Sequence, residues 1–265
     1  MGLSMAVVAR EVWDTRDLSG AVLDENGELR TGALQTRYEP EDLNALEAAL
    51  RLKEAHGGAV TVLSPGDVRQ LDVAREALYR GADRAVRIAA DPDELDDAAL
   101  GALLGAAVRK LGEVNLVLVG TAVPDTAGSL LARHLAHALG WPAVSWVDAI
   151  EQLSADRVVA RRAIEMGYES VECQLPAVLA IGVALLEDDP RAPRPAKAML
   201  KLKLKKAEVP VWTPADLSMS DLAPLRATRR VRREAVPPRV IETRTVDPEN
   251  ESELRAMLDS VRKGV

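Results

Sequence analysis

The sequence contains no phenylalanine and a single cysteine, Cys173, among its 265 residues. One cysteine excludes a disulfide framework within the chain. Aromatic residues make up only 3% of the chain, so the core must be built from Ala, Val, Leu and Ile, which suits parallel strands covered by alanine-rich helices. The hydrophobic content of 48% is ordinary for a globular protein with one sizeable core or two modest ones.

The sequence also shows no secretory signal and no apolar run long enough to span a bilayer. We therefore expect a cytoplasmic protein without membrane insertion. The net charge of -7 argues against nucleic acid as a partner, because a phosphate backbone binds to a positive surface.

Recognisable catalytic and phosphate-binding motifs are missing. There is neither a GxGxxG nor a GxxxxGK[ST] pattern, so the sequence supports neither a dinucleotide fingerprint nor a P-loop. His134 and His137 lie three apart without an evident third metal ligand, and Cys173 falls in an expected strand, where a small core side chain is the favoured interpretation. We expect no catalytic residue and no metal site.

What is present is an alternation of buried strands and helices. The strands are expected at 5–10, 59–63, 85–89, 114–119 and 143–150, and the helices between them at 39–56, 68–80, 93–111 and 126–139. An antiparallel hairpin at 157–163 and 170–175 and a strand at 177–185 follow, and residues 13–36 form a loop or small hairpin. This order predicts an α/β fold with a doubly wound, mostly parallel sheet and an added antiparallel hairpin.

The chain divides by pattern into a nucleotide-binding α/β domain, residues 1–189, and a C-terminal extension, residues 190–265. Three prolines, Pro190, Pro193 and Pro195, disfavour a helix, and the Lys-Leu alternation at 200–206 has period two. An isolated extended strand of this kind would leave its leucine face uncovered. We interpret 190–206 as an arm that embraces a partner protein, with its basic groups near an acidic surface or cofactor phosphates; a solvated basic linker is the alternative.

The turns that follow three of the strands are the expected ligand site, because ligands of open α/β sheets bind outside the carboxyl ends of the strands. Small residues and free N–H groups there let a nucleotide phosphate approach the backbone, above all at the start of the expected helix 126–139. The alternative is that Gly and Ser at these turns serve only tight connection. The candidate residues are Val8, Ala9, Ser64, Pro65, Gly66, Gly120, Asp125, Gly128 and Ser129.

Four stretches in the same order resemble the beta subunit of electron transfer flavoproteins, the family that includes the Fix-type proteins. Residues 39–54 (EPEDLNALEAALRLKE) are similar to the family's Asn-Pro-x-Asp helix, with Glu39 in place of the asparagine. Residues 75–85, the hairpin 162–178 and the arm 190–206 match further family motifs. The resemblance covers most of residues 1–210.

The resemblance implies a heterodimer with an alpha subunit that holds most of an FAD site. This chain would hold AMP, or a second FAD in electron-bifurcating members, at the candidate residues given above, while Asp14 and Thr15 approach the alpha-bound flavin. The implied function is electron transfer from flavin dehydrogenases to an acceptor such as a quinone-reducing one, with no protein nucleophile required.

Two departures from the family pattern affect these expectations. Family members commonly continue the Asp125 loop as Asp-Thr-Gly-Gln or Asn-Gln-Thr-Gly. This chain has Ala127-Gly128-Ser129-Leu130 there, so backbone amides would have to make more of the phosphate contacts. The leucine that anchors dehydrogenases in the family falls near Pro195 here. A competing interpretation from another class is a nucleotide-sensing module of the universal-stress type, which has no use for the region after Asp189.

Overall fold

The computed structural model describes residues 2–16, 34–92, 95–121, 130–182, 193–219, 245–247 and 249–263, together with residues 22, 24, 30 and 32. The chain forms two compact units, Met1–Arg230 and Val231–Val265, and each is described by itself. Among the described residues, no helix combines the length and apolar character needed to cross a membrane.

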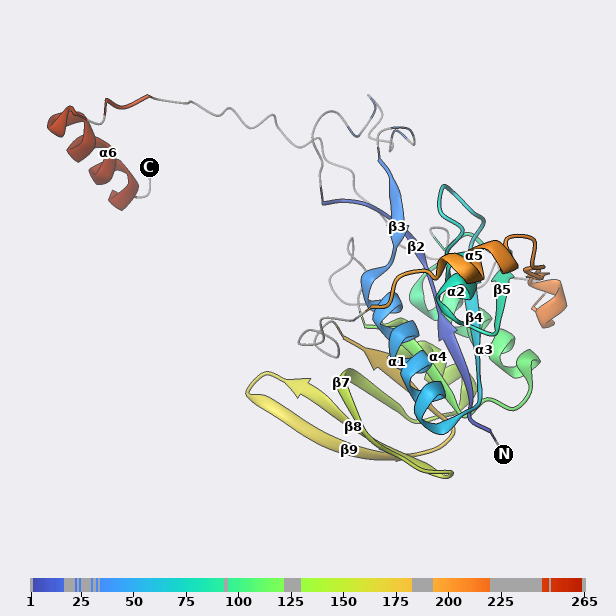
Figure 1. Cartoon of the computed structure of the whole chain (residues 1–265). Coiled ribbons are helices and arrows are strands. Elements are labelled where there is room, and N and C mark those ends of the chain that lie inside the picture. Colours follow the sequence, from blue (N-terminus) through green and yellow to red (C-terminus); the bar gives the residue numbers. More distant parts are fainter. Residues whose placement is uncertain are drawn as a thin grey trace. The chain divides into compact units, whose positions relative to one another are not determined.

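The first unit is built on one sheet whose strands lie in the order β11-β5-β4-β1-β6-β10-β7-β8-β9 (Figure 1). From β11 to β7 each neighbouring pair is parallel, and β7, β8 and β9 are antiparallel. The doubly wound, mostly parallel fold class is thereby confirmed. The strands are β1 (Ser4–Val8), β4 (Ala59–Pro65), β5 (Arg84–Ile88), β6 (Leu116–Gly120), β7 (Ala143–Leu153), β8 (Arg157–Ile164), β9 (Gly167–Gln174), β10 (Ala177–Ile181) and β11 (Val211–Trp212).

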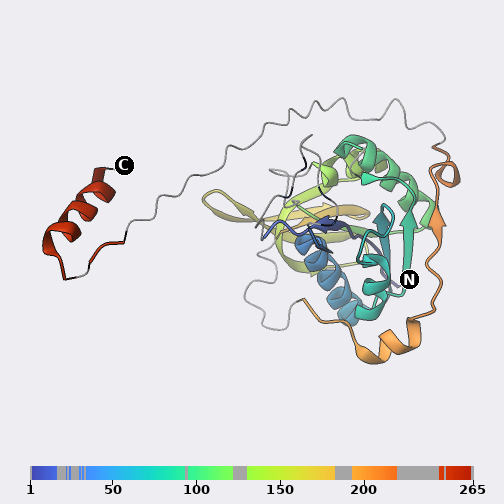
Figure 2. The same ribbon diagram turned by 90° about the horizontal axis from the view of Figure 1, so that it is seen from above.

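Helices cover both faces of this sheet (Figure 2). Met5 and Val7 of β1 belong to the core cluster shared with α1 (Pro40–His56) and α2 (Val73–Arg80). Ala6 and Val8 belong to the cluster shared with α3 (Asp97–Leu111) and α4 (Leu131–Leu139). Because successive residues of a strand point to opposite faces, the near-continuous apolar run of β1 fills two cores.

Two helices, α2 and α3, begin directly after an aspartate that caps them, and both start later than the sequence pattern predicts. Asp72 accepts a hydrogen bond from the Arg75 amide at 3.0 Å, so α2 begins at Val73 and not at Val68. Asp96 does the same for the Ala99 amide at 2.8 Å, so α3 begins after it.

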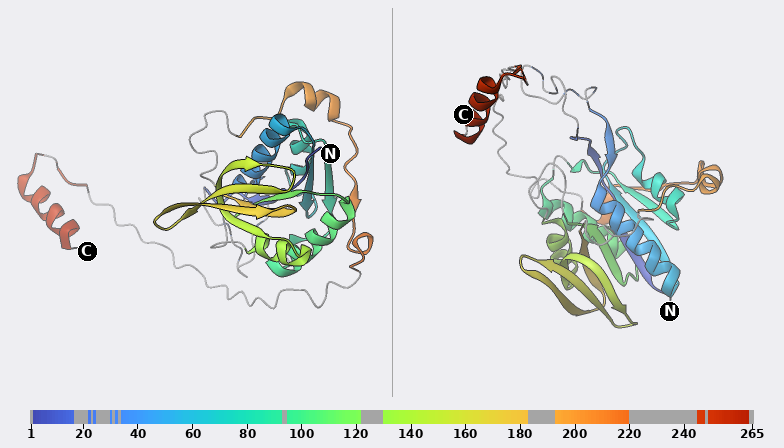
Figure 3. Two further views of the ribbon diagram at one scale, coloured as in Figure 1. Left: turned by 90° about the horizontal axis from the view of Figure 1, so that it is seen from below. Right: turned by 60° about the vertical axis from the view of Figure 1, so that its left-hand side comes forward.

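Two antiparallel hairpins extend from the parallel part. The small one pairs β2 (Glu11–Trp13) with β3 (Thr36–Tyr38), as expected for the region 13–36. The large one pairs β8 with β9 from Arg157 opposite Gln174 to the turn at Ile164 and Gly167, and it projects as the yellow ribbon in Figures 1 and 3. The predicted hairpin at 157–175 is confirmed.

The basic arm is helical where the Lys-Leu alternation predicted an extended strand. Ala198–Leu204 forms α5, so the extended prediction is wrong. Leu200 and Leu204 lie four apart and are half-buried, whereas Met199 and Leu202 are 78% and 79% exposed. In the helix, Leu200 and Leu204 therefore face the rest of the first unit, and Met199 and Leu202 face outward.

This segment is fastened to the chain's own α1 and α2 at both of its ends. Arg194 donates from Nε to Glu47 Oε2 at 2.8 Å and from Nη1 to Glu54 Oε1 at 2.6 Å, both on α1. After α5, Arg75 of α2 donates from Nη1 to the carbonyl oxygens of Lys205 at 3.0 Å and Ala207 at 2.9 Å. Residues 193–219 therefore pack within the first unit. In Figure 1, α5 is the orange helix that lies beside α2.

Replacing Leu204 by Asp is expected to destabilise the first unit by about 1–3 kcal/mol, because it puts a charge against the apolar cluster that Leu204 contacts. Urea unfolding of the full chain measures the change. Leu202→Asp is the matched control, since that side chain points outward and its replacement should leave the midpoint unchanged. Equal midpoints for both variants would contradict the placement of Leu204.

Candidate functional site

The three strands that precede the turns selected from the sequence end at one edge of the sheet. β4, β1 and β6 are immediate neighbours and run parallel, so their carboxyl ends lie side by side. The Ala9 amide donates to the Leu63 carbonyl at 2.9 Å, directly before Ser64. From β1 the chain continues to β4 and β5 on one side and then returns to β6 on the other side of β1. The boundary between β1 and β6 is therefore the topological switch point of the fold.

The candidate residues at this edge differ in what they expose. Val8 and Ala9 have no exposed surface and Ser64 is 4% exposed, so these residues form the floor of the edge. Gly66 follows β4 with a φ of 91°, a conformation that L side chains rarely adopt. Asp125, Gly128 and Ser129 lie outside the described residues, and their role stays a prediction.

A pocket of about 280 Å³ opens beside Gly66, at the carboxyl ends of β4 and β5. A Cβ built on Gly66 would stand 3.0 Å from Pro92 Cδ, so a side chain at this position would crowd the proline. The charged residues of the lining are three acidic side chains and one arginine. The complete lining is Glu11, Pro65, Gly66, Asp67, Arg69, Ala89, Ala90, Asp91 and Pro92.

Glu11 fixes the loop that forms one wall of this pocket. Its carboxylate accepts hydrogen bonds from three successive backbone amides, those of Arg69 at 2.9 Å and of Gln70 and Leu71 at 2.8 Å. Burial acts to raise the pKa of Glu11, but the Leu71 amide, the Thr36 hydroxyl and the other two amides outweigh it and lower the pKa. The amide donors of this loop are therefore already bonded to a carboxylate of the chain.

A buried ion pair occupies the switch point itself. Arg10 follows β1 and donates from Nε to Asp42 Oδ2 at 2.8 Å and from Nη2 to Asp42 Oδ1 at 2.9 Å. The amide of Gly120, at the end of β6, donates to Asp42 Oδ1 at 2.8 Å. Asp42 is fully buried and Arg10 is 6% exposed, so one carboxylate in the first turn of α1 joins two strands of the sheet.

Gly120 is needed for this contact. A Cβ at Gly120 would lie 2.8 Å from the Asp42 amide nitrogen, from Asp42 Oδ1 and from Glu41 Cβ. The space in front of Gly120, which the sequence pattern offered to a ligand, holds the first turn of α1.

Glu39 caps α1 from a buried position. Its Oε2 accepts a hydrogen bond from the Asp42 amide at 2.6 Å, and the residue is 2% exposed. Burial first, and then the negative charge of Asp42, raise the pKa of Glu39 to about 8, against the opposing effect of Arg10. The environment of the side chain that replaces the family's asparagine therefore favours the protonated carboxyl group.

The N-terminus of α4 does not begin where the sequence pattern placed it. The helix starts at Leu131, five residues beyond Thr126, and its N-cap residue Leu130 makes no side-chain capping bond. The Leu130 amide donates instead to Asp97 Oδ2 of α3 at 2.6 Å. The first described amide at this helix end is therefore bonded to a carboxylate of the chain.

Asp14 and Thr15 lie just after β2, on the small hairpin and away from the strand ends. Asp14 accepts from Arg16 Nε at 2.8 Å, and its carboxylate is 3.9 Å from Arg37 Nε. Hydrogen bonds from Arg16 are the main cause that lowers the pKa of Asp14 to about 2. The approach of Asp14 and Thr15 to a flavin stays a prediction.

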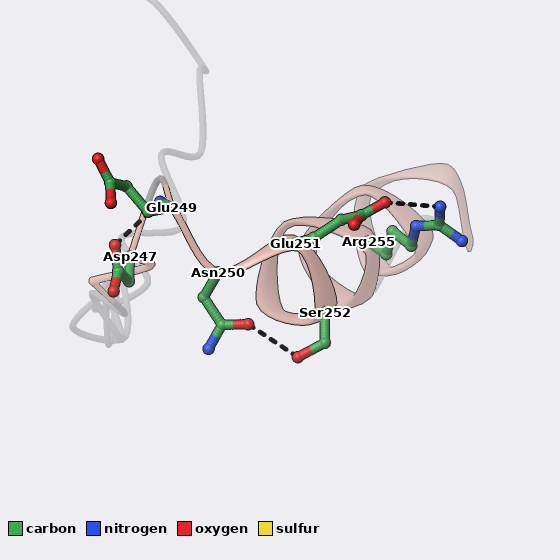
Figure 4. A pocket seen from close by; sticks show the side chains of 6 residues that line it. All are labelled: Asp247, Glu249, Asn250, Glu251, Ser252 and Arg255. Carbon is green, nitrogen blue, oxygen red and sulfur yellow. Dashed lines mark hydrogen bonds and ion pairs between the residues drawn. The ribbon is translucent and has the colours of Figure 1, made fainter.

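The second unit has its own hollow at the start of α6 (Glu251–Lys263), shown in Figure 4. Its polar side chains bond to one another: Ser252 Oγ donates to Asn250 Oδ1 at 2.8 Å, and Arg255 Nη2 donates to Glu251 Oε1 at 2.7 Å. These contacts order the helix terminus and do not point to a ligand.

Sequence reasoning missed Arg10, Glu39, Asp42 and Asp97 as determinants of the site. The signal for three of them was present, because Arg10 follows the first strand directly and Glu39 and Asp42 stand in the helix-start motif that carried the resemblance. Asp97 carried no such signal.

Glu39→Gln is expected to remove a pH dependence of stability. With a folded pKa of about 8 against an ordinary value of 4.5, native Glu39 holds its proton more tightly than unfolded Glu39. Its contribution to stability is complete below pH 4.5 and is lost as the pH rises to about 8. The free energy of unfolding of the variant relative to the parent should increase across this window and level off above it. Glu113→Gln, at an exposed residue, is the control; parallel curves for Glu39→Gln and the parent would contradict the buried proton.

Gly120→Ala is expected to destabilise the chain by about 1–3 kcal/mol, because the new methyl group displaces Asp42 from its amide bond. Denaturant unfolding provides the measurement. Gly32→Ala is the control, since a Cβ there meets nothing within 4 Å. A Gly120→Ala midpoint equal to that of Gly32→Ala would show that α1 does not press on this turn.

Comparison with known proteins identifies the family. The family model described as electron transfer flavoprotein domain matches residues 31–217. The caffeyl-CoA reductase-Etf complex subunit CarD of Acetobacterium woodii is 31% identical over 71% of this chain and 71% of its own length. Protein FixA of Azorhizobium caulinodans is 34% identical, covering 71% of this chain and 68% of the relative.

The electron transfer flavoprotein subunit beta of Clostridium acetobutylicum is 32% identical over 67% of each chain. The family match and these relatives agree with the motifs at the start of α1, at the α2 turn and in the β8–β9 hairpin. The chain therefore belongs to the electron transfer flavoprotein family, as a subunit of the beta and FixA type.

Proposed function

We propose that this chain is the beta-type half of a heterodimeric electron transfer flavoprotein. It carries electrons from flavin dehydrogenases to an acceptor, through an FAD that an alpha-type subunit holds for the most part. The observation that carries the proposal is the family match over residues 31–217, which includes every strand of the large sheet except β1, the β8–β9 hairpin and α5. The same match argues against the nucleotide-sensing alternative, because it continues beyond residue 189.

The flavin, when bound, supplies the electron-transfer chemistry. The chain's own residues position the partner surfaces. Asp14 and Thr15 on the small hairpin are the residues that we propose to approach the flavin, and Glu11 and Arg69 hold the base of that hairpin to the loop before α2. The proposal needs no protein nucleophile.

An exposed apolar stripe on α6 supports the need for a second subunit. Leu258 is 61% exposed and Val261 is 71% exposed, three residues apart on one side of the helix. A helix with such a stripe and no core of its own gains stability by packing against another protein.

The outward face of α5 is the docking surface that we propose for the electron-donating dehydrogenase. Met199 and Leu202 stand out from this helix, and Lys201, Lys203 and Lys205 around them are exposed. An apolar pair within a ring of positive charge fits an acidic partner surface that surrounds an apolar cleft. Arg194 and Arg75, which fasten the two ends of the segment, keep this face in a fixed position and so reduce the entropy lost on binding.

A nucleotide in the chain's own site, AMP or a second FAD, finds weaker support. Two described amides near the switch point, those of Gly120 and Leu130, are bonded to carboxylates of the chain and are not available to a phosphate. No step of the proposed electron transfer passes through this site.

Co-expression of the chain with the neighbouring open reading frame tests the subunit assignment. We expect a yellow heterodimer that contains FAD. A colourless, fully stable monomer that ignores a flavin-bearing companion would overturn the proposal.

Leu202→Asp tests the docking surface in that heterodimer. Electron transfer from the cognate dehydrogenase should require a partner concentration about tenfold higher, because a charge replaces an apolar anchor, while flavin content and thermal stability stay unchanged. Leu202→Met, which keeps the apolar contact, is the control. A Leu202→Asp complex with the parental KM for the dehydrogenase would place the docking surface elsewhere.

A further inference from the structure

The antiparallel end of the sheet carries the exposed aromatic side chains of the protein. The structure describes all seven aromatic residues, four Trp and three Tyr. Trp146 of β7 and Tyr168 of β9 are exposed, at 49% and 62%, and the other five are buried or half-buried. The turn of the β8–β9 hairpin adds Ile164 and Met166, the latter 93% exposed. The hairpin projects from the body of the first unit (Figure 3), so its apolar side chains are open to a partner.

The two aromatic positions lie close together across three neighbouring strands. Val147, directly after Trp146, pairs with Arg162 of β8, and the next residue of β8, Ala163, pairs with Tyr168. Because neighbouring strands are about 4.8 Å apart, roughly 10 Å separates β7 from β9 here. One protein surface can therefore contact both aromatic side chains. We call the exposed apolar residues of this region the hairpin surface: Trp146, Ile164, Met166 and Tyr168.

Trp146 stands where β7 changes its partner strand. β7 pairs with β10 as far as Val147 and with β8 from Val147 onward, and the backbone of Trp146 is left-handed, with a φ of 58°. Glycine and asparagine adopt this conformation at a lower cost than a bulky aromatic residue. The local backbone therefore gains nothing from the indole, whose exposed half is open to another protein.

The arginines of β8 are already paired within the chain. Arg161 Nη2 lies 2.8 Å from Asp148 Oδ2, and the guanidinium of Arg161 also lies over the ring of Tyr168, at 4.7 Å. Arg157 and Arg162 each have a side-chain nitrogen 3.2 Å from a glutamate oxygen of β9. A partner at the hairpin surface therefore meets aromatic and apolar groups among paired charges, which is the composition of a permanent interface.

The position of the hairpin in the sheet also favours a permanent partner. β9 is the outermost strand, and in the described part of the chain it pairs with β8 alone. Proteins cover such an edge because its free backbone groups would otherwise pair with other chains. α5, in contrast, packs on α2, which contacts β4 and β5 toward the β11 end of the sheet. One protein can therefore stay bound at the hairpin surface while another binds and leaves at α5.

We infer that the hairpin surface is the permanent docking site of the alpha-type subunit, with Trp146 and Tyr168 as its anchors. The inference rests on the proposed heterodimer and deepens it, because it assigns the second subunit to a surface separate from α5. The exposed lysines of α5 suit a partner that is attracted by charge and released again. The paired charges and exposed aromatic rings of the hairpin suit a partner that does not leave.

Oxidation by hydroxyl radicals, read by mass spectrometry, tests the inference on the parental heterodimer obtained by co-expression. We expect Met166 to be oxidised about fivefold more slowly in the folded complex than in the same complex unfolded in urea, because an interface excludes water from its anchors. Met199 of α5, 78% exposed, is the internal control and should react at close to its unfolded rate. Oxidation of Met166 at the unfolded rate would overturn the inference. Equal protection of Met166 in the chain purified without the second subunit would also overturn it, since a second copy of the chain would then cover the surface.

Trp146→Asn tests the anchor itself. Asparagine removes the indole and tolerates the left-handed backbone, so the thermal midpoint of the chain alone should stay unchanged. Exchange of the variant out of the heterodimer, against an affinity-tagged parental chain, should be about thirtyfold faster than for the parent. Trp146→Tyr, which keeps an aromatic ring, should exchange at close to the parental rate. Val211→Thr, at an exposed residue of β11 on the opposite edge of the sheet, is the matched control.

A Trp146→Asn chain that exchanges at the parental rate would contradict the role of Trp146 as an anchor. Failure of the proposed function has a different readout, a parental chain that forms no flavin-containing complex with the second subunit. A yellow heterodimer in which Met166 stays fully reactive would refute the inference alone, so the two failures are distinguishable.

Discussion

One buried carboxylate holds the candidate site together. Asp42 accepts hydrogen bonds from Arg10 after β1 and from the Gly120 amide at the end of β6, and it belongs to the first turn of α1. The charge is fully buried, so removing either partner would leave a desolvated ion without compensation. This contact fixes the start of α1 over the switch point. The position of α1 then determines which side chains lie at this edge of the sheet.

Because α1 enters so close to the sheet, the chemistry of the edge becomes acidic. Glu39 caps α1 and Glu41 lies in its first turn. Asp42 occupies the space that a side chain at position 120 would need, so this position requires glycine. The second helix layer adds Asp97, which caps α4 in the absence of a polar N-cap residue. In related folds a helix end is a ready anion site, whereas here the described amides of Gly120 and Leu130 are bonded to the protein's own carboxylates.

Much of this architecture could be predicted from the sequence, for identifiable reasons. The apolar runs of β1, β6 and β10 lie buried on both faces, so their pattern leaves little choice but parallel central strands. Their convergence at one edge then follows from topology. The ends of helices were less predictable, because Asp72 and Asp96 were not distinguishable from neighbouring acidic residues until their amide partners were known.

Two features could not be predicted from pattern alone. The Lys-Leu alternation reads as a strand, yet the segment is helical, since tertiary contacts of Leu204 with the core and of Arg75 with the last carbonyls outweigh a weak local preference. The bond between Asp97 and Leu130 joins residues 33 apart in sequence, and no local signal announces it.

The arm shows how one segment can serve both the fold and recognition. Its helix is too short to be stable alone in water, at seven residues. Arg194 and Arg75 stabilise it through charge-assisted hydrogen bonds at both ends, and Leu200 and Leu204 anchor its inner side, so its outer side is free for a partner. If only the partner held the segment, the entropy lost on ordering it would reduce the free energy of binding. Because the chain orders it beforehand, Met199 and Leu202 are presented in place, and the affinity of a brief electron-transfer encounter depends on their contacts rather than on folding the arm.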